Sequence, residues 1–328
     1  MRISKNLLVA SLMICLTSNG TKGANELPLE VKGITENQIS STNKSTEKFT
    51  LLSGFSLTST DPRFGGISSI QIQKDGKFLW AISDRGNWMR FSLSHRVGKL
   101  IAVRLDNIEA LQMPDKEKWH IRNQDAEASA YIDPNTLLIS FERVNRLLAY
   151  RFTEKGIEGS PRLYPRPKEL ALAPPTGGPE AMTRLCDGRF FVLSEKTAFN
   201  EKNHIGWVGD KKKWQTFRYK PRKNFKPTGA ATLPDCRVLL TIRRFNFTSF
   251  SWGFALLHPS NIHSSKILED SASSHFVHPA ITENFEAVAA HRGKDGNTYI
   301  YVMADDNFSI FQATLLLQFK LNSKFKNH

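Results

Sequence analysis

The sequence predicts an all-β protein folded as a β-propeller, most simply with five four-stranded blades. Three observations lead to this prediction: a strand–turn–strand pattern occurs five times, its copies are evenly spaced, and no comparable helical periodicity is present. Four short strands repeated around an axis are typical of propeller blades. The sequence therefore argues against a βαβ fold.

In the repeated unit a pair of small residues, often headed by Glu, opens a short strand; a turn and an apolar strand with a charged end follow. The copies are SSIQIQKDGKFLWAISDR (68–85), EASAYIDPNTLLISFER (127–143), EAMTRLCDGRFFVLSEK (180–196), GAATLPDCRVLLTIRR (229–244) and EAVAAHRGKDGNTYIYVMADD (286–306). Their starts lie 59, 53, 49 and 57 residues apart, which leaves room for four strands each. A sixth blade within the longer intervals remains an alternative.

The last unit has only three apparent strands, whereas FTLLSGFSL (49–57) precedes the first complete unit. An N-terminal strand that completes the last blade would remove an exposed sheet edge. We therefore expect residues 49–57 to close the ring. The central apolar strands, such as FLWAIS and FFVLS, are hydrophobic on both faces, as expected for strands buried between stacked blades.

The N-terminus has the features of a secretory signal peptide. Arg2 and Lys5 precede an apolar stretch at residues 7–16, which is too short to span a bilayer, and small residues follow it. The polar sequence after it predicts a flexible leader. The expected division is a signal peptide (1–24), a leader (25–47), the propeller domain (48–321) and a C-terminal tail (322–328). We expect a periplasmic or secreted protein without a membrane span after cleavage.

The chain is strongly basic, with a net charge of +14, and loss of three basic residues with the signal peptide leaves +11. Such a surface favours anionic partners. In an exported protein these would be anionic small molecules or envelope polymers rather than nucleic acid. The segment 210–227 combines basic and aromatic residues, which can bind nucleic acid. An outer strand followed by a solvated loop explains this segment better.

Cys186 and Cys236 are the cysteines that remain after signal cleavage. An even pair in an oxidising compartment predicts a disulfide. Both residues lie in the turn between the first two strands of neighbouring units, on the face opposite the acidic strand ends. Two free thiols are the alternative if these turns lie too far apart.

Acidic residues recur at matching places in the units. Ends of apolar strands carry Asp84, Glu142, Glu195 and Asp305, with Ile242 in the fourth unit, and strand starts carry Glu127, Glu180 and Glu286. In an antiparallel pair the start of one strand lies beside the end of the next. We therefore expect all seven acids at one mouth of the central channel.

Close carboxylates repel one another unless a cation compensates them. Calcium accepts about six to eight oxygen ligands in flexible geometry, so we expect Ca²⁺ here. The predicted metal ligands are Asp84, Glu127, Glu142, Glu195 and Asp305; Glu180 or Glu286 would act as general base, and Arg85, Arg143 and Arg244 would hold substrate negative charge. Alternatively, the arginines neutralise the acids in a ring of structural salt bridges and leave no room for metal.

Over roughly residues 48–321 the chain resembles a known family. GGISSIQIQKDGKFLWAISDRGNW (65–88), YKPRKNFKPTGAATLP (219–234) and ENFEAV…ADDNFSIFQATLLLQFKL (283–321) resemble the phytase-like domain called "esterase-like activity of phytase". The resemblance implies a bacterial exported propeller that hydrolyses ester or phosphoester bonds. Where the family tends to have an acid before Arg-Arg in the fourth unit, this chain has Ile242.

Two functions follow from these observations. The first is an exported, metal-assisted phosphoester or ester hydrolase, although no G-x-S-x-G elbow, zinc motif or P-loop is present. The second is a non-catalytic periplasmic propeller that binds an anionic ligand or a protein partner. Both functions would use the acidic mouth of the channel.

Overall fold

The computed structural model describes residues 27–34, 48–114, 120–172, 175–197, 202–222, 225–246, 249–262, 267–276, 283–309 and 311–322. The expected signal peptide lies outside the described residues, as do most of the expected leader and tail. No helix in the described part of the chain is both long enough and apolar enough to cross a membrane.

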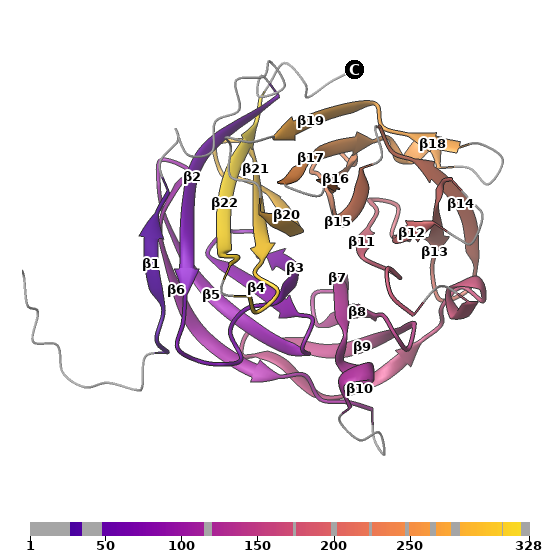
Figure 1. Cartoon of the computed structure of the whole chain (residues 1–328), viewed down its shortest axis with the longest axis horizontal. Coiled ribbons are helices and arrows are strands. Elements are labelled where there is room, and N and C mark those ends of the chain that lie inside the picture. Colours follow the sequence, from indigo (N-terminus) through magenta and orange to yellow (C-terminus); the bar gives the residue numbers. More distant parts are fainter. Residues whose placement is uncertain are drawn as a thin grey trace, which may run out of the picture.

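The described strands form five sheets arranged around a central axis (Figure 1). The first blade contains β3 (Ile67–Ile72), β4 (Phe78–Ser83), β5 (Asn87–Arg96) and β6 (Lys99–Ala110). The second contains β7 (Ala126–Asp133), β8 (Thr136–Phe141), β9 (Arg146–Thr153) and β10 (Gly156–Tyr164). In each blade the first strand lies nearest the axis. The predicted five-bladed propeller is confirmed, and the alternative of six blades is not supported.

The third blade contains β11 (Ala181–Arg184), β12 (Phe190–Thr197), β13 (His204–Gly209) and β14 (Trp214–Lys220), with the short β18 (Ile267–Glu269) parallel to β14. The fourth contains β15 (Lys226–Thr232), β16 (Val238–Asn246), β17 (Ser249–Leu257) and β19 (Ala272–Phe276). Within the described ranges, three short helical segments connect strands: α2 (Ile121–Gln124), η2 (Glu169–Leu172) and η4 (Pro259–Asn261).

The last blade combines strands from both ends of the described chain. It contains β20 (Asn284–Arg292), β21 (Thr298–Asp305) and β22 (Thr314–Leu321), followed outward by β2 (Phe49–Thr58) and β1 (Glu30–Gly33). β2 pairs antiparallel with β22, from Phe49 opposite Leu321 to Leu57 opposite Thr314. These backbone hydrogen bonds join segments about 270 residues apart in sequence.

The core lies between the blades. All residues of β21 are buried, as the two-sided hydrophobic pattern predicts. The ring centroid of Trp252 in the fourth blade lies 4.3 Å from that of Phe276 in the same blade. It lies 4.1 Å from that of Phe285 in the last blade. Aromatic side chains bury large apolar areas, so such contacts hold neighbouring blades in a fixed arrangement.

The predicted disulfide between Cys186 and Cys236 is confirmed. The two Cα atoms lie 5.6 Å apart, within the range that a disulfide spans. Cys186 lies in the turn between β11 and β12, and Cys236 lies in the turn between β15 and β16. The bond therefore connects the third and fourth blades.

Candidate functional site

Two of the three acids at the strand starts, Glu127 and Glu286, lie at β-bulges. In β7 the pairing with β8 skips Glu127, because Ala126 lies opposite Phe141 and Ala128 lies opposite Ser140. A bulged residue is unpaired and leaves the regular alternation of side chains, so a bulge can redirect a side chain. The pairing of β20 with β21 skips Glu286 in the same way.

Matching bulges at Ser68 and Thr228 carry hydroxyl groups instead of acids. Ser68 Oγ donates a hydrogen bond to the carbonyl oxygen of Ala126, 2.6 Å away in the second blade. Thr228 Oγ1 donates to the carbonyl oxygen of Phe285, 2.9 Å away in the last blade. In these two blades the equivalent side chain therefore connects adjacent blades rather than adding charge to the mouth.

The strand register corrects one sequence alignment. Ile242 pairs with Pro227, immediately before the bulge, and its side chain is fully buried in the core between blades. The place that Glu142 occupies in its own blade therefore belongs to Arg243 in the fourth. The sequence comparison aligned Gly229 with Glu127, but the bulge places Thr228 there. One member of the ring of strand-end acids is thus a cation.

Arg243 connects acids from two other blades. Its Nη2 atom lies 2.8 Å from Glu195 Oε1, and its Nη1 atom lies 2.8 Å from Glu286 Oε1. It also donates a hydrogen bond to Asn284 Oδ1. Burial disfavours the charged guanidinium, but Glu286 and Glu195 outweigh this effect and raise the pKa of Arg243. Burial alone would raise the pKa of Glu195, but Arg243 and Lys226 hold that pKa below its usual value.

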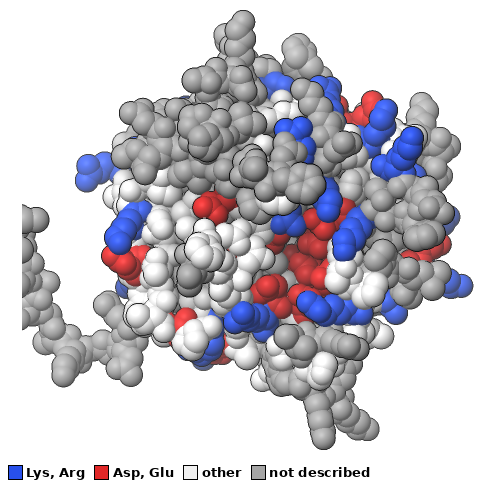
Figure 2. Space-filling view, viewed as in Figure 1, with Lys and Arg blue, Asp and Glu red and all other residues white. Residues whose placement is uncertain are grey.

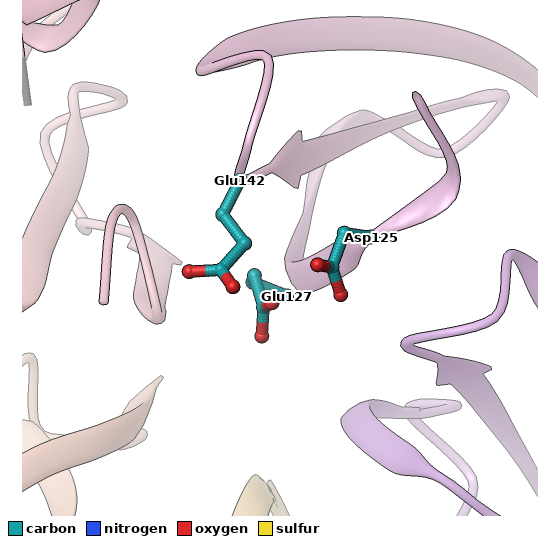
Figure 3. Close-up of side chains that lie close together, drawn as sticks. All are labelled: Asp125, Glu127 and Glu142. Atoms are coloured by element: carbon teal, nitrogen blue, oxygen red, sulfur yellow. The ribbon is translucent and has the colours of Figure 1, made fainter. Parts of the chain in front are cut away.

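Three carboxylates gather on the side of the second blade. Oxygens of Asp125, Glu127 and Glu142 lie within 4.8 Å of one another, and all three residues are buried (Figure 3). Glu142 Oε2 accepts hydrogen bonds from the backbone N–H groups of Gly177 (2.6 Å) and Gly178 (3.3 Å). Burial, reinforced by neighbouring acids, raises the pKa values of Glu127 and Glu142.

Asp125 is a site residue that the sequence comparison missed. It lies just before β7 and forms an ion pair with Arg143. Asp125 stands two residues before Glu127 in the sequence, and this second acid beside a strand-start acid was the available signal.

Three other predicted acids lie around this triad. The carboxyl group of Glu180 lies beside that of Glu127, and burial followed by the charge of Glu286 raises the pKa of Glu180. Burial, followed by the charges of Asp125 and Glu286, raises the pKa of Asp84 to about 7. The buried Oδ1 atom of Asp84 has no hydrogen-bond partner among the described residues.

Asp305 completes the predicted set from the last blade. Its Oδ1 atom accepts a hydrogen bond from the backbone N–H of Asn307 at 2.7 Å, and its Oδ2 atom accepts one from Asn284 Nδ2 at 3.3 Å. Burial, reinforced by Glu286 and Asp84, raises its pKa. Figure 2 shows acidic side chains gathered in a hollow near the middle of this face, with basic side chains along its margin.

The predicted anion-binding arginines fall into two groups. Arg143 is paired with Asp125. The guanidinium carbon of Arg85 lies 3.3 Å from the ring centroid of Phe308, and that of Arg244 lies 5.0 Å from the ring centroid of Phe225. Among the described residues neither Arg85 nor Arg244 forms an ion pair. A guanidinium stacked on a ring keeps its charge and its in-plane N–H donors.

Two solved structures are similar to this chain at low sequence identity. One, titled "YCF48 bound to D1 peptide", is 11% identical with a TM-score of 0.37, over 82% of this chain and 71% of that chain. Another, titled "COPII on membranes, outer coat vertex", is 10% identical with a TM-score of 0.39, over 84% and 70%. The search of curated proteins finds no match. A family model for phytase-like domains, described as esterase-like activity of phytase, matches residues 62–308, and the chain therefore belongs to this phytase-like family.

Proposed function

We propose that the acidic mouth is the active site of an exported hydrolase that cleaves ester or phosphoester bonds with the help of a bound Ca²⁺ ion. The observation that carries this proposal is the set of three buried carboxylates, Asp125, Glu127 and Glu142, whose oxygens lie within 4.8 Å of one another. Calcium binds oxygen ligands at 2.3–2.6 Å, so two ligands of one ion can lie up to about 5 Å apart. The three side chains therefore fit a single cation.

The donor set also suits a hard divalent cation. All donors are carboxylate oxygens, which calcium prefers over nitrogen or sulfur. The charge of Asp84 interacts with that of Asp125, and the charge of Asp305 interacts with that of Asp84. The Oδ1 atom of Asp84 has no hydrogen-bond partner among the described residues. We leave Glu195 out of the proposed ligand set, because Arg243 and Lys226 already neutralise it.

The other side chains of the mouth would bind the substrate and accept a proton from the attacking water. A bound cation would polarise the oxygen of the scissile group and stabilise negative charge that develops on it. Arg85 and Arg244, which form no ion pair among the described residues, would hold the negative charge of the substrate through their N–H donors. Glu180 would accept a proton from the attacking water, because a carboxylate of raised pKa is a stronger base. Glu286 is a weaker candidate, since Arg243 and Asn284 both bind its Oε1 atom.

Export is part of the proposal. The N-terminal charged and apolar sequence indicates secretion. The disulfide between Cys186 and Cys236 supports an oxidising compartment, since such bonds seldom persist in the cytosol.

Calorimetry and turnover together test the hydrolase proposal. Calcium should bind the purified protein, and p-nitrophenyl phosphate or p-nitrophenyl acetate should be hydrolysed only with calcium present. Glu127→Gln should weaken calcium binding, whereas Glu180→Gln should abolish turnover and retain binding. Glu154→Gln, at an exposed acid on the turn after β9, is the matched control. Absence of both calcium binding and turnover would show that the proposal is wrong.

A second candidate is a non-catalytic propeller that binds an anionic ligand or a protein partner at the same mouth. The observation that favours it is that Arg243 forms ion pairs with both Glu195 and Glu286. These acids then have a structural role and are not free for chemistry. Stacked Arg85 and Arg244 could bind an anion without any chemistry. Saturable phosphate binding that is indifferent to calcium, with no hydrolysis of either ester, would favour this candidate.

A further inference from the structure

A second concave site lies at the opposite end of the channel from the acids. It is a cavity of about 1040 Å³ whose walls come from the first strand of every blade. Gln71, Tyr131, Thr183, Ala231 and Ala289 represent the five strands, and all follow the bulged or acidic strand starts in sequence. No residue of the acidic mouth lines this cavity.

The walls of the cavity are mainly hydrocarbon. The lining includes five alanine side chains: Ala130, Ala230, Ala231, Ala289 and Ala290. The hydroxyl groups of Thr183 and Thr232 bond to each other at 3.0 Å, and Gln71 Nε2 donates to the carbonyl oxygen of Ser129 at 2.8 Å. Arg184 donates to backbone carbonyl oxygens of Ile132 and Gly188. Water in such a cavity finds few partners, so an apolar guest can displace it favourably.

Tyr131 adds an aromatic polar side chain to the wall. Its ring meets Phe152 edge to face, with centroids 5.2 Å apart, and both residues line the cavity. No described residue forms a hydrogen bond with its hydroxyl group. Burial raises the pKa of Tyr131, so the hydroxyl remains protonated and can donate. The wall thus places a hydrogen-bond donor, the Tyr131 hydroxyl, beside an aromatic surface.

We propose that this cavity binds an uncharged, largely apolar small molecule that carries a hydrogen-bond acceptor for Tyr131. Its volume is at the upper end of the range of about 300–1,000 Å³ that is usual for small-molecule pockets. The lining contains two basic residues, Lys74 and Arg184, and two acidic residues, Asp75 and Asp133, so its formal charges balance and give no preference for an anion. This site is separate from the acidic mouth and does not depend on the proposed hydrolase.

Two uncharged fluorescent dyes test the site on the full chain. Nile red carries a carbonyl acceptor, and N-phenyl-1-naphthylamine carries none. Both dyes should bind saturably with one strong site per chain. Ala290→Trp, in the cavity wall, should weaken both dyes by at least about tenfold, because the larger ring fills the space. Ala102→Trp, an exposed position on the outer strand β6, is the matched control and should leave both affinities unchanged.

Tyr131→Phe isolates the hydrogen bond. It keeps the ring contact with Phe152 and removes the hydroxyl, so Nile red should lose roughly three- to tenfold in affinity, the effect of one neutral hydrogen bond. N-phenyl-1-naphthylamine should bind as before. Circular dichroism and the thermal midpoint verify that each variant is folded, and Tyr131→Phe carries the test if Ala290→Trp does not fold. Absence of saturable binding, equal loss in Ala102→Trp, or equal effects of Tyr131→Phe on both dyes would overturn the proposal.

Discussion

Replacing Arg243 with alanine would remove the cation that connects two buried acids from different blades. Arg243 makes two ion pairs at 2.8 Å, to Glu195 and to Glu286, and its side chain is only 22% exposed. After the substitution Glu286 would keep a hydrogen bond from Asn284, and Glu195 would keep Lys226 at 3.7 Å. Both carboxylates would otherwise remain buried without their main counter-charge.

The expected loss in the free energy of unfolding of Arg243→Ala follows from this geometry. Removing one partner of a buried ion pair costs about 3–5 kcal/mol, because the remaining charge is left uncompensated. We expect the free energy of unfolding of Arg243→Ala to fall by about 3–5 kcal/mol at pH 8, since Lys226 and Asn284 compensate only in part. An exposed ion pair is worth about 0–1 kcal/mol. Arg189→Ala, which removes the exposed pair with Asp187, is therefore the control and should cost at most about 1 kcal/mol.

The stability lost in Arg243→Ala should also depend on pH, and it should be larger at high pH than at low pH. In the native protein Arg243 helps to hold the pKa of Glu195 below its ordinary value, so this group contributes stability at high pH that is lost as pH falls through its folded-state pKa. Without Arg243, burial would raise the folded-state pKa of Glu195 above its unfolded-state value, and the pKa of Glu286, which burial already raises in the native protein, would rise further. The variant would then gain stability by binding protons as pH falls. The difference from the native protein should therefore shrink between pH 8 and pH 5.

Urea unfolding at pH 5, 6.5 and 8, with chelator present throughout, measures this difference directly. The chelator removes any contribution from cations bound at the triad. A loss below about 1 kcal/mol at pH 8, or a loss that grows towards pH 5, would refute the electrostatic reasoning. Arg243→Lys should recover part of the stability, because it restores the charge without the two-pronged guanidinium geometry.

Three further predictions concern the disulfide, a glycine and export. Replacing Cys186 and Cys236 with serine should lower the free energy of unfolding by about 4 kcal/mol, since the bond closes a loop with a sequence separation of 50 residues; two titratable thiols in unreduced, denatured protein would contradict the bond. Gly66→Ala should destabilise by about 1–3 kcal/mol, because Gly66 has a φ of +61° and a Cβ would lie 2.3 Å from Asp84 Oδ1; Gly33→Ala, with open space around its Cβ position, should cost far less. The mature protein should lack about two dozen residues on N-terminal sequencing, and an intact cytoplasmic N-terminus would contradict export.

The blades could be predicted because their signal is repeated and local. Apolar second strands such as TLLISF and FFVLS recur with turn residues before them, and they correspond to β8 and most of β12. The number of repeats then sets the number of sheets. The bulges could not be predicted in the same way, because a bulge shifts the pairing by one residue without a distinct local sequence.

This one-residue shift explains the error at Ile242. The sequence comparison aligned strand ends by their apolar residues and placed Ile242 among the acids. The actual pairing of Ile242 with Pro227 moves Arg243 into that place. The ion pairs of Arg243 depend on side chains from two other blades, and no local pattern contains that information. The convergence of the acidic side chains at one mouth could be predicted from the repeat, whereas the ion-pair partners of Arg243 could not.

The sequence left two interpretations of the acidic mouth open, a metal site and a ring of structural salt bridges. Each applies to a different side of the mouth. Towards the third, fourth and last blades, Arg243 and Lys226 neutralise Glu195, and Arg243 also pairs with Glu286. Towards the second blade, Glu127 and Glu142 have no ion pair among the described residues, and Arg143 pairs with Asp125 alone. Arginine therefore supplies the counter-charge on one side, and the excess negative charge lies on the other. A cation bound at the triad can coexist with the ion pairs of Arg243, so Arg243→Ala should reduce stability in chelator, whereas Glu127→Gln should reduce calcium affinity.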